Sequence, residues 1–374
     1  MIIHCVAAVD YETMPVVDVM DRDLVDKLME YSLMSPQPMS IEEMIECGDR
    51  SIYSEEASFT FLKKEMAIRI AHMIMELQRL PKDLHEEEVC MKTMDKYSTT
   101  FKEVIEFQDM EPSDVVLKNF KGKLVTFRNR HKDTTLEMGQ ACKAMKEKKE
   151  KSATKDDIDQ LFSSFRIVLD RFFTSRISIH MITNHHLELF SKDRVQNSEM
   201  GLIRRKCDIR SILSDVVDEV TMYMENVYMA CPKVDIKMYK NAREITEPVE
   251  GALVPGHLTF IFTEVLKNSM RATVEHHFKD LENLPPVTAT ICQADDYFTI
   301  KISDCGGGMD RDSAAKCFMY QYSTPSKYCE GQFCLFLTGS GLPMARLYAR
   351  YFQGEIKMAS YEVRTYGKCC IYKP

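Results

Sequence analysis

The sequence predicts an α+β protein in which a helical half comes first and a half of alternating strands and helices follows. Three observations support this class. A chain of 374 residues is longer than one hydrophobic core usually serves, which favours two domains. Apolar residues recur at helical spacing from about residue 21 to residue 190. After about residue 193, short runs with strand-like alternation are separated by glycines and helices.

The composition describes a soluble globular protein, with 45% hydrophobic and 28% charged residues. A net charge of -8 argues against broad nucleic-acid binding and leaves room for a local basic pocket. The 13 cysteines are scattered, which favours reduced thiols inside a cell over a disulfide framework. No apolar run reaches the length that would predict a membrane span.

The first residues do not resemble a targeting segment. They are apolar for nine residues and then acidic, whereas organelle transit peptides are rich in arginine and poor in acids. A secretory signal would need a basic start, and this sequence has none. Residues 1–20 are therefore expected to form an N-terminal arm.

Four long helices are expected in the first half, enough for an up-down four-helix bundle over residues 21–195. The segments that carry the helical period are residues 58–80, 90–107, 119–145 and 162–190. The first of them places Phe61, Leu62 and Met66 near one stripe, and Pro81 follows as a stop signal. A charge run at residues 143–157 is expected to be a solvated helix end or loop.

The second half, residues 196–374, is expected to hold a mixed sheet covered by helices on one face. The polar, irregular stretch 191–208 is predicted to be a hinge. Residues 297–304 alternate Phe298, Ile300 and Ile302 on one side, which is typical of a strand with one buried face. Residues 355–372 are predicted to form a terminal hairpin.

One helix in this half carries an unusual polar face. Residues 263–277 place Glu264, Lys267, Asn268 and Arg271 at i, i+3, i+4 and i+7, so they share one face. A core-facing stripe would be apolar there, and a solvated stripe would need no asparagine. An amide oxygen beside a carboxylate offers the hard oxygen ligands that magnesium prefers together with substrate phosphates.

Two glycine segments complete the predicted site. The strand at 297–304 delivers Asp304 and then Gly306, Gly307 and Gly308, and such glycines allow a ligand to approach the backbone closely. In the second segment Gly339 and Gly341 precede a helix, whose N–H groups suit phosphate. An aspartate at a strand end is able to accept from the amino group of an adenine.

Each of these three motifs alone is weak evidence for a binding site, but their order along the chain is specific. Glu-x-x-Lys-Asn, then Asp-x-Gly-x-Gly, then Gly-x-Gly-Leu-Pro resembles the GHKL-type (Bergerat) ATP-binding fold of sensor histidine kinases, heat-shock protein 90 chaperones and MutL. The flanking motifs look like the mitochondrial pyruvate dehydrogenase kinase family, over nearly everything from Tyr31 to the C-terminus. They are "SFTFLKKEM", "FRNRHKDTTLEM", "LDRFFTSRISIHM", "KNSMRATVEHH", "KISDCGGG", "MYQYSTP" and "GLPMARLYARYFQG". The related branched-chain α-ketoacid dehydrogenase kinases are a second fit, slightly favoured by "TNHH" at 183–186.

The resemblance implies a kinase that phosphorylates serine on the E1 alpha subunit of pyruvate dehydrogenase with Mg-ATP. Glu264 would be the general base for the substrate hydroxyl, Asn268 the magnesium ligand, Arg271 a nucleotide contact and Asp304 the adenine acceptor. The positions that the family motifs place around the nucleotide are Glu264, Lys267, Asn268, Arg271, Asp304, Gly306, Gly308, Ser323, Thr324, Gly339, Ser340, Gly341 and Leu342.

The resemblance also implies regulation and partners. A pocket for a small acid such as pyruvate would involve Tyr97, Arg128, His131 and Arg176. A neutral, hydrogen-bonded His131 is the preferred interpretation over a phosphorylated one. Family members bind the lipoyl domain of E2, form homodimers and work in the mitochondrial matrix, so the same is expected here.

Five departures from the family pattern bear on activity. Phe260 stands where relatives have a histidine four residues before the base, and Leu337 replaces the first glycine of the phosphate loop. The last strand lacks the family threonine, and Thr365 does not stand at the matching position. Relatives continue into a longer tail where this sequence stops at Pro374, and Cys305 replaces a usual arginine. Two alternatives therefore stay open beside the active kinase: a catalytically weakened member that binds nucleotide or a partner, and a branched-chain-type kinase.

Overall fold

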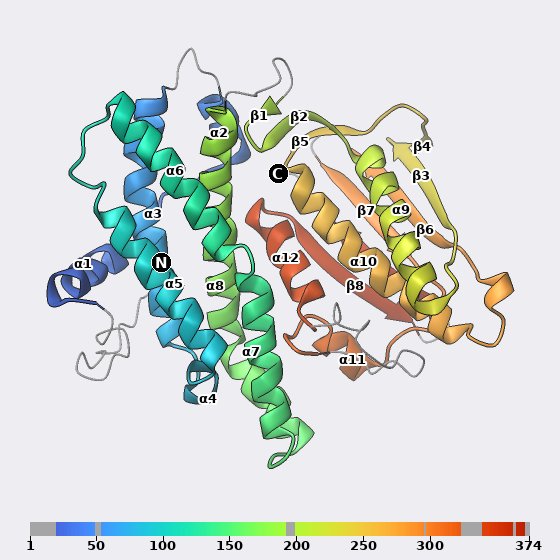
Figure 1. The fold of residues 1–374 in the computed structure, drawn as a ribbon. Coiled ribbons are helices and arrows are strands. Elements are labelled where there is room, and N and C mark those ends of the chain that lie inside the picture. Colours follow the sequence, from blue (N-terminus) through green and yellow to red (C-terminus); the bar gives the residue numbers. More distant parts are fainter. Residues whose placement is uncertain are drawn as a thin grey trace. The chain divides into compact units, whose positions relative to one another are not determined.

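The fold is that of a computed structural model, described for residues 20–48, 54–191, 199–294, 297–322, 339–361 and 364–370 (Figure 1). It divides into two compact units that are not continuous in sequence. The helical unit comprises Met1–Pro38, Ser54–Lys149 and Ile167–Thr183, and the sheet unit comprises Met39–Tyr53, Glu150–Arg166 and Asn184–Pro374.

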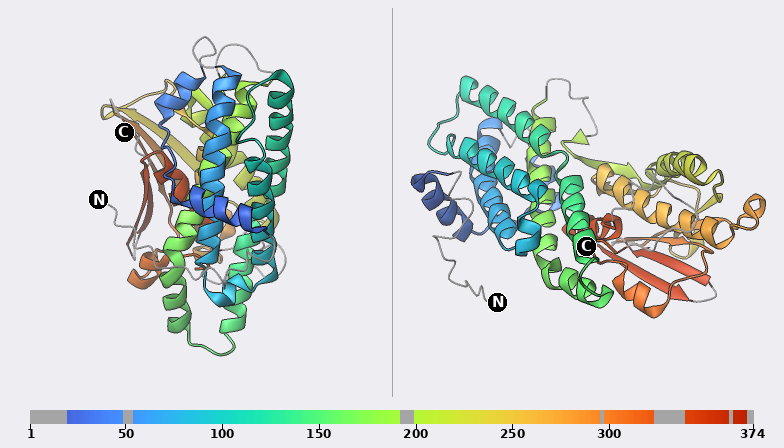
Figure 2. Two further views of the ribbon diagram at one scale, coloured as in Figure 1. Left: turned by 90° about the vertical axis from the view of Figure 1, so that its left-hand side faces the viewer. Right: turned by 60° about the horizontal axis from the view of Figure 1, so that its bottom comes forward.

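The helical unit is built from helices that pack side by side. These are α1 (Arg22–Leu33), α3 (Glu55–Gln78), the short α4 (Lys82–His85), α5 (Glu88–Ile105), α6 (Asp114–His131), α7 (Thr134–Lys149) and the central part of α8 (Lys155–Leu189). Helix α3 contacts α1, α5 and α6, and α5 also contacts α7 (Figure 2). The long amphipathic segments of the first half are therefore helices, as predicted.

Local sequence explains where α3 begins and what it packs against. Ser54 caps its N-terminus, because the Ser54 side chain accepts a hydrogen bond from the Ala57 N–H. Phe59 is fully buried and meets Phe120 edge to face with ring centroids 4.9 Å apart. Phe61, expected on the buried stripe, is only partly buried. The helix is enclosed on several sides in its second half, so burial there extends beyond one stripe.

Residues 119–145, which were expected to form one helix, form parts of two helices. Helix α6 ends at His131 and α7 begins at Thr134. The Arg176 Nη2 donates to the carbonyls of His131 and Lys132 at 3.1 Å and 3.2 Å. These carbonyls lie at the end of a helix, where intrahelical donors run out, so an arginine from α8 stabilises the break.

The sheet unit contains three groups of strands within its described residues. A four-stranded sheet has the order β4-β3-β6-β7, a second sheet has the order β1-β2-β5, and β8 pairs with β9. The strands are β1 (Glu199–Met200), β2 (Ile203–Asp208), β3 (Val234–Lys240), β4 (Arg243–Glu244), β5 (Glu250–Leu253), β6 (Val287–Gln293), β7 (Phe298–Ser303), β8 (Glu355–Tyr361) and β9 (Arg364–Cys370). Strands β3 and β6 are parallel and β6 and β7 antiparallel, so the sheet is mixed, as predicted.

Three helices of this unit lie on one face of the sheet (Figures 1 and 2). They are α9 (Ile209–Tyr228), α10 (Pro255–His276) and α12 (Gly341–Tyr351), whose apolar residues form one core with β6 and β7. The described part of this unit also contains α2 (Ile41–Cys47), α11 (Arg311–Lys316), the 3-10 turn Leu281–Asn283 and both ends of α8. On β7, Phe298, Ile300 and Ile302 are all buried, which confirms the predicted alternation.

Two further expectations for this half have different outcomes. The terminal hairpin is confirmed, because β8 and β9 pair antiparallel from Glu355↔Cys370 to Tyr361↔Arg364. The hinge expected over 191–208 is wrong in its second part, where Ile203–Asp208 forms a strand that pairs with β5. Ile203 and Cys207 of that strand are buried, so a single buried side outweighs its polar composition.

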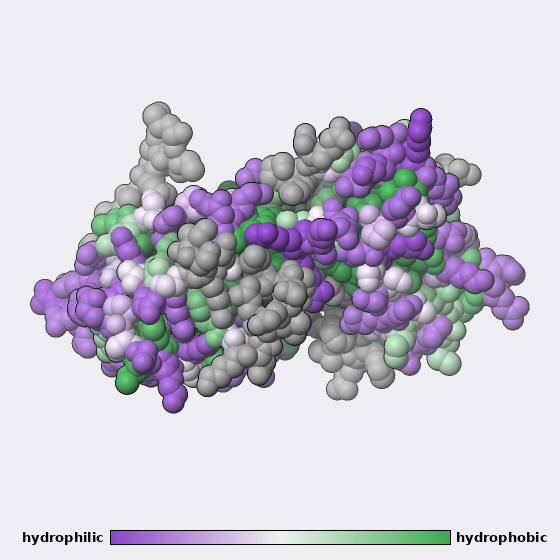
Figure 3. All heavy atoms as spheres, turned by 90° about the horizontal axis from the view of Figure 1, so that it is seen from above, coloured by the Kyte–Doolittle hydropathy of each residue, from purple (hydrophilic) through white to green (hydrophobic). Residues whose placement is uncertain are grey.

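The surface carries mixed polarity. On the face drawn in Figure 3, hydrophilic residues surround smaller hydrophobic areas. Across the ranges described above, no helix combines the length and apolar character required to cross a membrane.

Candidate functional site

The side chains on the predicted polar face of helix α10 are partly buried. Pro255 occupies its first turn, a position that needs no backbone donor. Residues 261, 262, 265, 266, 269, 270, 273 and 274 are buried against the core. The residues between them, 264, 267, 268 and 271, are neither buried nor exposed. These four side chains therefore lie neither in the core nor fully in solvent, so they remain accessible to a ligand.

The polar side chains of this face are held by one another. Lys267 Nζ lies 2.5 Å from Glu264 Oε1, with the two side chains only 18% and 14% exposed. Asn268 Nδ2 donates to the carbonyl of Glu264 at 2.6 Å, so this bond engages the amide nitrogen and not the oxygen. Arg271 Nε donates to Glu275 Oε1 at 2.9 Å. Along the face, two cations, Lys267 and Arg271, thus lie between two carboxylates, Glu264 and Glu275.

The glycine segments meet this helix. A Cβ added at Gly341, the first residue of α12, would overlap the carboxylate of Glu264. A Cβ at Gly306 would lie 2.8 Å from the carbonyl carbon of Ala272, and a Cβ at Gly307 would overlap the ring of His276. At Gly306 the obstacle is helix backbone, which cannot move aside, whereas at Gly307 and Gly341 it is a side chain of α10. Two segments far apart in sequence, the loop after Asp304 and the start of α12, therefore meet α10.

A backbone hydrogen bond holds the Asp304 carboxylate, and two glycines with positive φ shape the loop after it. Asp304 ends the run of β7, is 6% exposed, and accepts a hydrogen bond from the Gly306 N–H at 3.0 Å. Gly307 and Gly308 have φ of 78° and 84°, a conformation that other residues adopt only with strain. The buried carboxylate is thus held at the strand end, as an adenine acceptor would have to be.

The start of α12 forms the other side of the site. Gly339 has φ of 65°, and a Cβ there would lie 2.7 Å from the Cα of Gln321. Ser340 is 7% exposed and precedes the helix, whose first turn has no side-chain cap hydrogen bond. Leu342 packs against the core. The N–H groups of such a first turn suit an anion.

Some predicted positions are not described. Ser323, Thr324 and Leu337 lie outside the described residues. Among the described residues, no group of three or more His, Cys, Asp or Glu side chains is arranged to hold a metal ion. A magnesium ion here would therefore depend on a single protein ligand such as Asn268 together with phosphate oxygens, a set that suits this ion.

Phe260 differs from the family pattern in a way that the structure makes concrete. It stands one turn before Glu264 and packs on Tyr348 of α12, with ring centroids 4.9 Å apart. An aromatic hydrocarbon has no hydrogen bond to offer the carboxylate. Among the described residues, Lys267 pairs with the Glu264 carboxylate, and the Gly341 backbone at the start of α12 lies close to it.

Glu275 and Tyr228 join this polar face, although the sequence pattern did not indicate them. The Tyr228 hydroxyl, at the end of α9, donates to Glu275 Oε1 at 3.0 Å, the same oxygen that Arg271 contacts. The spacing of four residues between Arg271 and Glu275 on one helix was a signal for their pairing. Nothing in the sequence indicated that a tyrosine from another helix would join them.

In the helical unit, three of the four residues predicted to bind a small acid, Tyr97, His131 and Arg176, lie close together. His131 stacks on Tyr97 with centroids 4.1 Å apart, and its Nε2 lies 2.8 Å from the Thr100 hydroxyl. Burial, then the charges of Arg130, Arg176 and Lys96, lower the pKa of His131 to about 3, so its ring is neutral. Burial raises the pKa of Tyr97 to about 12.

Arg176 and Arg128 take different places around this cluster. Arg176 contacts the backbone of His131, as described above, whereas Arg128 is exposed on α6. Thr100, which sequence analysis missed, is the hydroxyl that joins His131 to Arg130, whose Nη1 lies 2.7 Å away.

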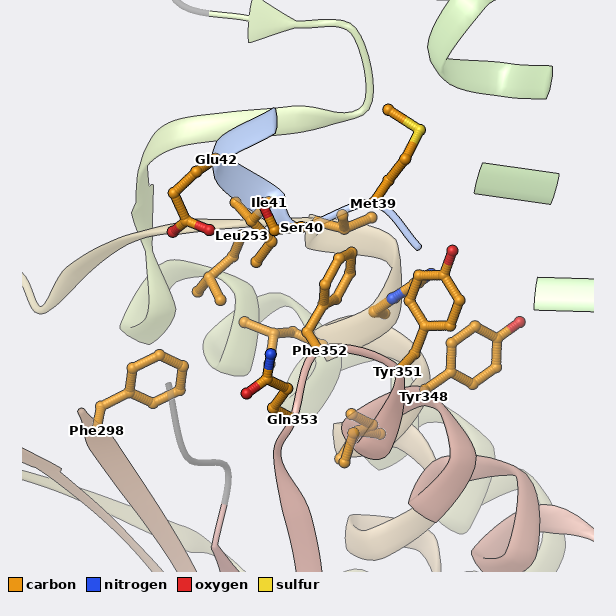
Figure 4. Close-up of a pocket in the computed structure, with 15 residues that line it drawn as sticks. Met39, Ser40, Ile41, Glu42, Leu253, Phe298, Tyr348, Tyr351, Phe352 and Gln353 are labelled. Carbon is orange, nitrogen blue, oxygen red and sulfur yellow. The ribbon is translucent and has the colours of Figure 1, made fainter. Parts of the chain in front are cut away.

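A separate apolar cavity of about 90 Å³ lies in the sheet unit (Figure 4). Its walls come from the start of α2, β5, α10, β7 and the end of α12, and include His257, Tyr348, Phe352 and Gln353. None of the predicted site residues lines it. It is also smaller than the cavities that hold drug-sized ligands, which measure roughly 300 Å³ or more.

Comparison with known proteins matches this chain over most of its length. A family model described as mitochondrial branched-chain alpha-ketoacid dehydrogenase kinase matches residues 38–204. The mouse [pyruvate dehydrogenase (acetyl-transferring)] kinase isozyme 3, mitochondrial, is 35% identical over 343 residues, which is 90% of this chain and 80% of the relative. The human isozyme 3 is 35% identical over 343 residues, covering 90% and 82%. The mitochondrial [pyruvate dehydrogenase (acetyl-transferring)] kinase of Drosophila melanogaster is 34% identical over 337 residues, covering 89% and 80%.

Proposed function

Because the chain belongs to the pyruvate dehydrogenase kinase family, we propose that it transfers the γ-phosphate of ATP to a serine of the E1 alpha subunit of pyruvate dehydrogenase. The reaction inactivates the complex and so regulates pyruvate metabolism in the mitochondrial matrix. The observation that carries the proposal is the convergence of Glu264, the loop after Asp304 and the start of α12 on one side of α10.

The sheet unit supports a GHKL-type nucleotide domain, which we propose for residues 196–374. Asp304 would accept from adenine, Arg271 and Lys267 would face the nucleotide, and the start of α12 would face phosphates. Ser323 and Thr324 are proposed to complete the site. The mixed sheet with helices on one face supports this assignment.

In the transfer step, Glu264 is proposed as the general base. The serine hydroxyl gives its proton to the Glu264 carboxylate while its oxygen forms a bond to the γ-phosphorus. The bond between the γ-phosphorus and the bridging oxygen breaks, and ADP leaves with the electron pair. Lys267 pairs with Glu264 at 2.5 Å, and a phosphate of the bound nucleotide would compete for its ammonium.

Magnesium is the implied cofactor, and Asn268 is its proposed protein ligand. When bound, the ion would neutralise charge that develops on the phosphates. Asn268 Nδ2 already bonds to the helix backbone, which fixes the amide plane. The protein's own contribution is then to orient the amide oxygen and to hold Glu264 beside it.

For the helical unit, we propose a four-helix-bundle regulatory domain over residues 21–195 that also contacts the lipoyl domain of E2. The Tyr97, Arg128, His131 and Arg176 cluster is proposed to bind a small carboxylic acid such as pyruvate. The stacked Tyr97 and the nearby arginines support this role, because a carboxylate is recognised by guanidinium groups. A homodimer is proposed from the family.

The test is phosphate incorporation into purified E1 alpha from ATP labelled at the γ-position, with branched-chain E1 as the comparison substrate. Glu264→Gln should lower the rate by about 10²-fold or more, because the base is lost. Glu282→Gln, an exposed acid on the Leu281–Asn283 turn, is the matched control and should retain the rate. An unchanged rate for Glu264→Gln would contradict the assignment of the base.

Two other results would contradict the proposal more broadly. Incorporation into branched-chain E1 in place of pyruvate dehydrogenase E1 would overturn the substrate. If ADP with magnesium fails to raise the thermal stability of the protein, nucleotide binding itself is excluded, because a saturating ligand at 100 times its Kd adds about 2.7 kcal/mol.

A further inference from the structure

We infer that Glu275 and Tyr228 position the Arg271 guanidinium for nucleotide binding, an inference that rests on the proposed function. The three side chains share one carboxylate oxygen: Arg271 Nε lies 2.9 Å from Glu275 Oε1, and the Tyr228 hydroxyl lies 3.0 Å from the same atom. Glu275 thereby joins two helices, since Tyr228 is the last residue of α9.

Tyr228, whose hydroxyl holds the Glu275 carboxylate, is itself fixed in the fold. Tyr228 is 8% exposed and belongs to the hydrophobic core of the sheet unit. The helix ends directly after it at Met229, whose φ of 56° and N–H bond to the Glu225 carbonyl at 3.0 Å form a left-handed cap. A hydroxyl held in this way limits the positions open to the Glu275 carboxylate.

Because a guanidinium is planar, its contact with Glu275 orients the whole Arg271 head group. Its N–H donors lie in one rigid plane, so fixing Nε relative to Glu275 fixes the direction of the others. The side chains of Arg271 and Glu275 are 11% and 21% exposed, which makes their charge-assisted hydrogen bond stronger than a solvated surface pair.

The position along α10 places this arginine beside the predicted nucleotide. Arg271 immediately precedes Ala272, the residue against which Gly306 packs, and Gly306 in turn bonds to Asp304. Glu275 therefore holds Arg271 at the end of the face that lies next to the loop after Asp304.

A purely structural ion pair would behave differently from a positioning pair. Loss of a structural pair changes stability but leaves ligand affinity unchanged. Loss of a positioning pair weakens the ligand through one residue, and its effect disappears when that residue is removed. The double-mutant cycle between positions 271 and 275 separates the two roles.

The experiment measures ADP affinity by calorimetry in the presence of magnesium, using the full chain. Glu275→Gln keeps the size of the side chain and removes its charge, and should weaken ADP about fivefold to tenfold. Tyr228→Phe removes one hydroxyl and should weaken ADP about twofold to threefold. Arg271→Ala should weaken ADP by at least as much as Glu275→Gln, and the Arg271→Ala/Glu275→Gln double variant should bind like Arg271→Ala alone.

The matched control is Glu88→Gln, which removes an exposed i,i+4 pair with Lys92 on α5. It should leave ADP affinity unchanged. Thermal unfolding without nucleotide confirms that each variant is folded. With E1 as substrate, Glu275→Gln should raise the KM for ATP more than it lowers kcat, because the chemical groups are intact.

Two results would overturn the inference while leaving the kinase intact. One is unchanged ADP affinity and ATP KM in a folded Glu275→Gln variant. The other is an additive double variant, in which Glu275→Gln costs as much without Arg271 as with it. Failure of the unsubstituted protein to bind ADP would instead remove the proposed function, and this inference with it.

Discussion

Replacing Gly306 by alanine tests the close approach between the loop after Asp304 and helix α10. The added Cβ would lie 2.8 Å from the carbonyl carbon of Ala272 and would overlap the Ala272 Cβ. The obstacle is helix backbone, which moves only with the helix, so the loop has to shift away. Gly306 is not among the residues with positive φ, so the penalty comes from overlap and not from backbone strain.

The magnitude follows from two opposing contributions. Overpacking of this kind costs about 1–3 kcal/mol. Alanine also restricts the unfolded chain, which offsets about 0.4–1 kcal/mol. The free energy of unfolding should therefore fall by about 1 kcal/mol, within a range of roughly 0 to 2.6 kcal/mol. ADP should bind more weakly as well, because the Gly306 N–H that orients Asp304 moves with the loop.

The assay is urea unfolding followed by hydrogen–deuterium exchange, which reports peptides of the helical and sheet units separately. Gly122→Ala is the matched control: it makes the same chemical change at an exposed position of α6 with nothing within 4 Å of the added Cβ. It should raise stability by about 0.5–1 kcal/mol, because glycine disfavours a helix interior. A gain in stability of Gly306→Ala equal to that of Gly122→Ala would refute the packing argument.

Three further predictions address activity, pH and the helical core. Phe260→His should raise the rate of phosphate transfer to E1 about tenfold or more in initial-rate measurements, by restoring a polar neighbour one turn before Glu264; a lower rate would show that the contact with Tyr348 matters more. The pKa of His131 is depressed to about 3 from 6.5, so the unfolded chain binds the extra proton and stability should be lost as pH falls below about 6.5. Between pH 7 and pH 5 this residue should cost about 1–2 kcal/mol in urea unfolding, and a His131→Gln variant whose stability falls just as steeply would contradict the assignment. Phe120→Ala should cost about 3–5 kcal/mol, because its ring is fully buried against Phe59; a loss below 1 kcal/mol would show that the cluster repacks.

Sequence periodicity was sufficient for the fold class and for the strongest elements. The alternation at Phe298, Ile300 and Ile302 predicted β7 correctly, because one face of that strand is buried and the other is not. The break between α6 and α7 could not be predicted, because Arg176, distant in the chain, binds the carbonyls at that break. Strand β2 was missed because its charged residues point outward and only Ile203 and Cys207 are buried.

The candidate site divides in a similar way. The shared face of Glu264, Lys267, Asn268 and Arg271 followed from helical spacing alone, and their roles stay predictions. The contact between Glu264 and Gly341 could not be read from spacing, because it depends on how α12 packs on α10. The resemblance to a family supplied the order of the motifs, and only the fold shows which side chains meet.

The parallel pairing of β3 and β6 has a consequence for how the protein is synthesised. Val234 pairs with Val287, and the connection between these strands contains all of α10. Such non-local pairing pays its loop-closure entropy early and tends to form slowly. When the nascent chain has left the ribosome only as far as α10, strands β6 and β7 have not yet been made. Helix α10 would then expose both its polar and its apolar face. Maturation of this protein is therefore expected to require emergence of β6 before any nucleotide-binding surface exists.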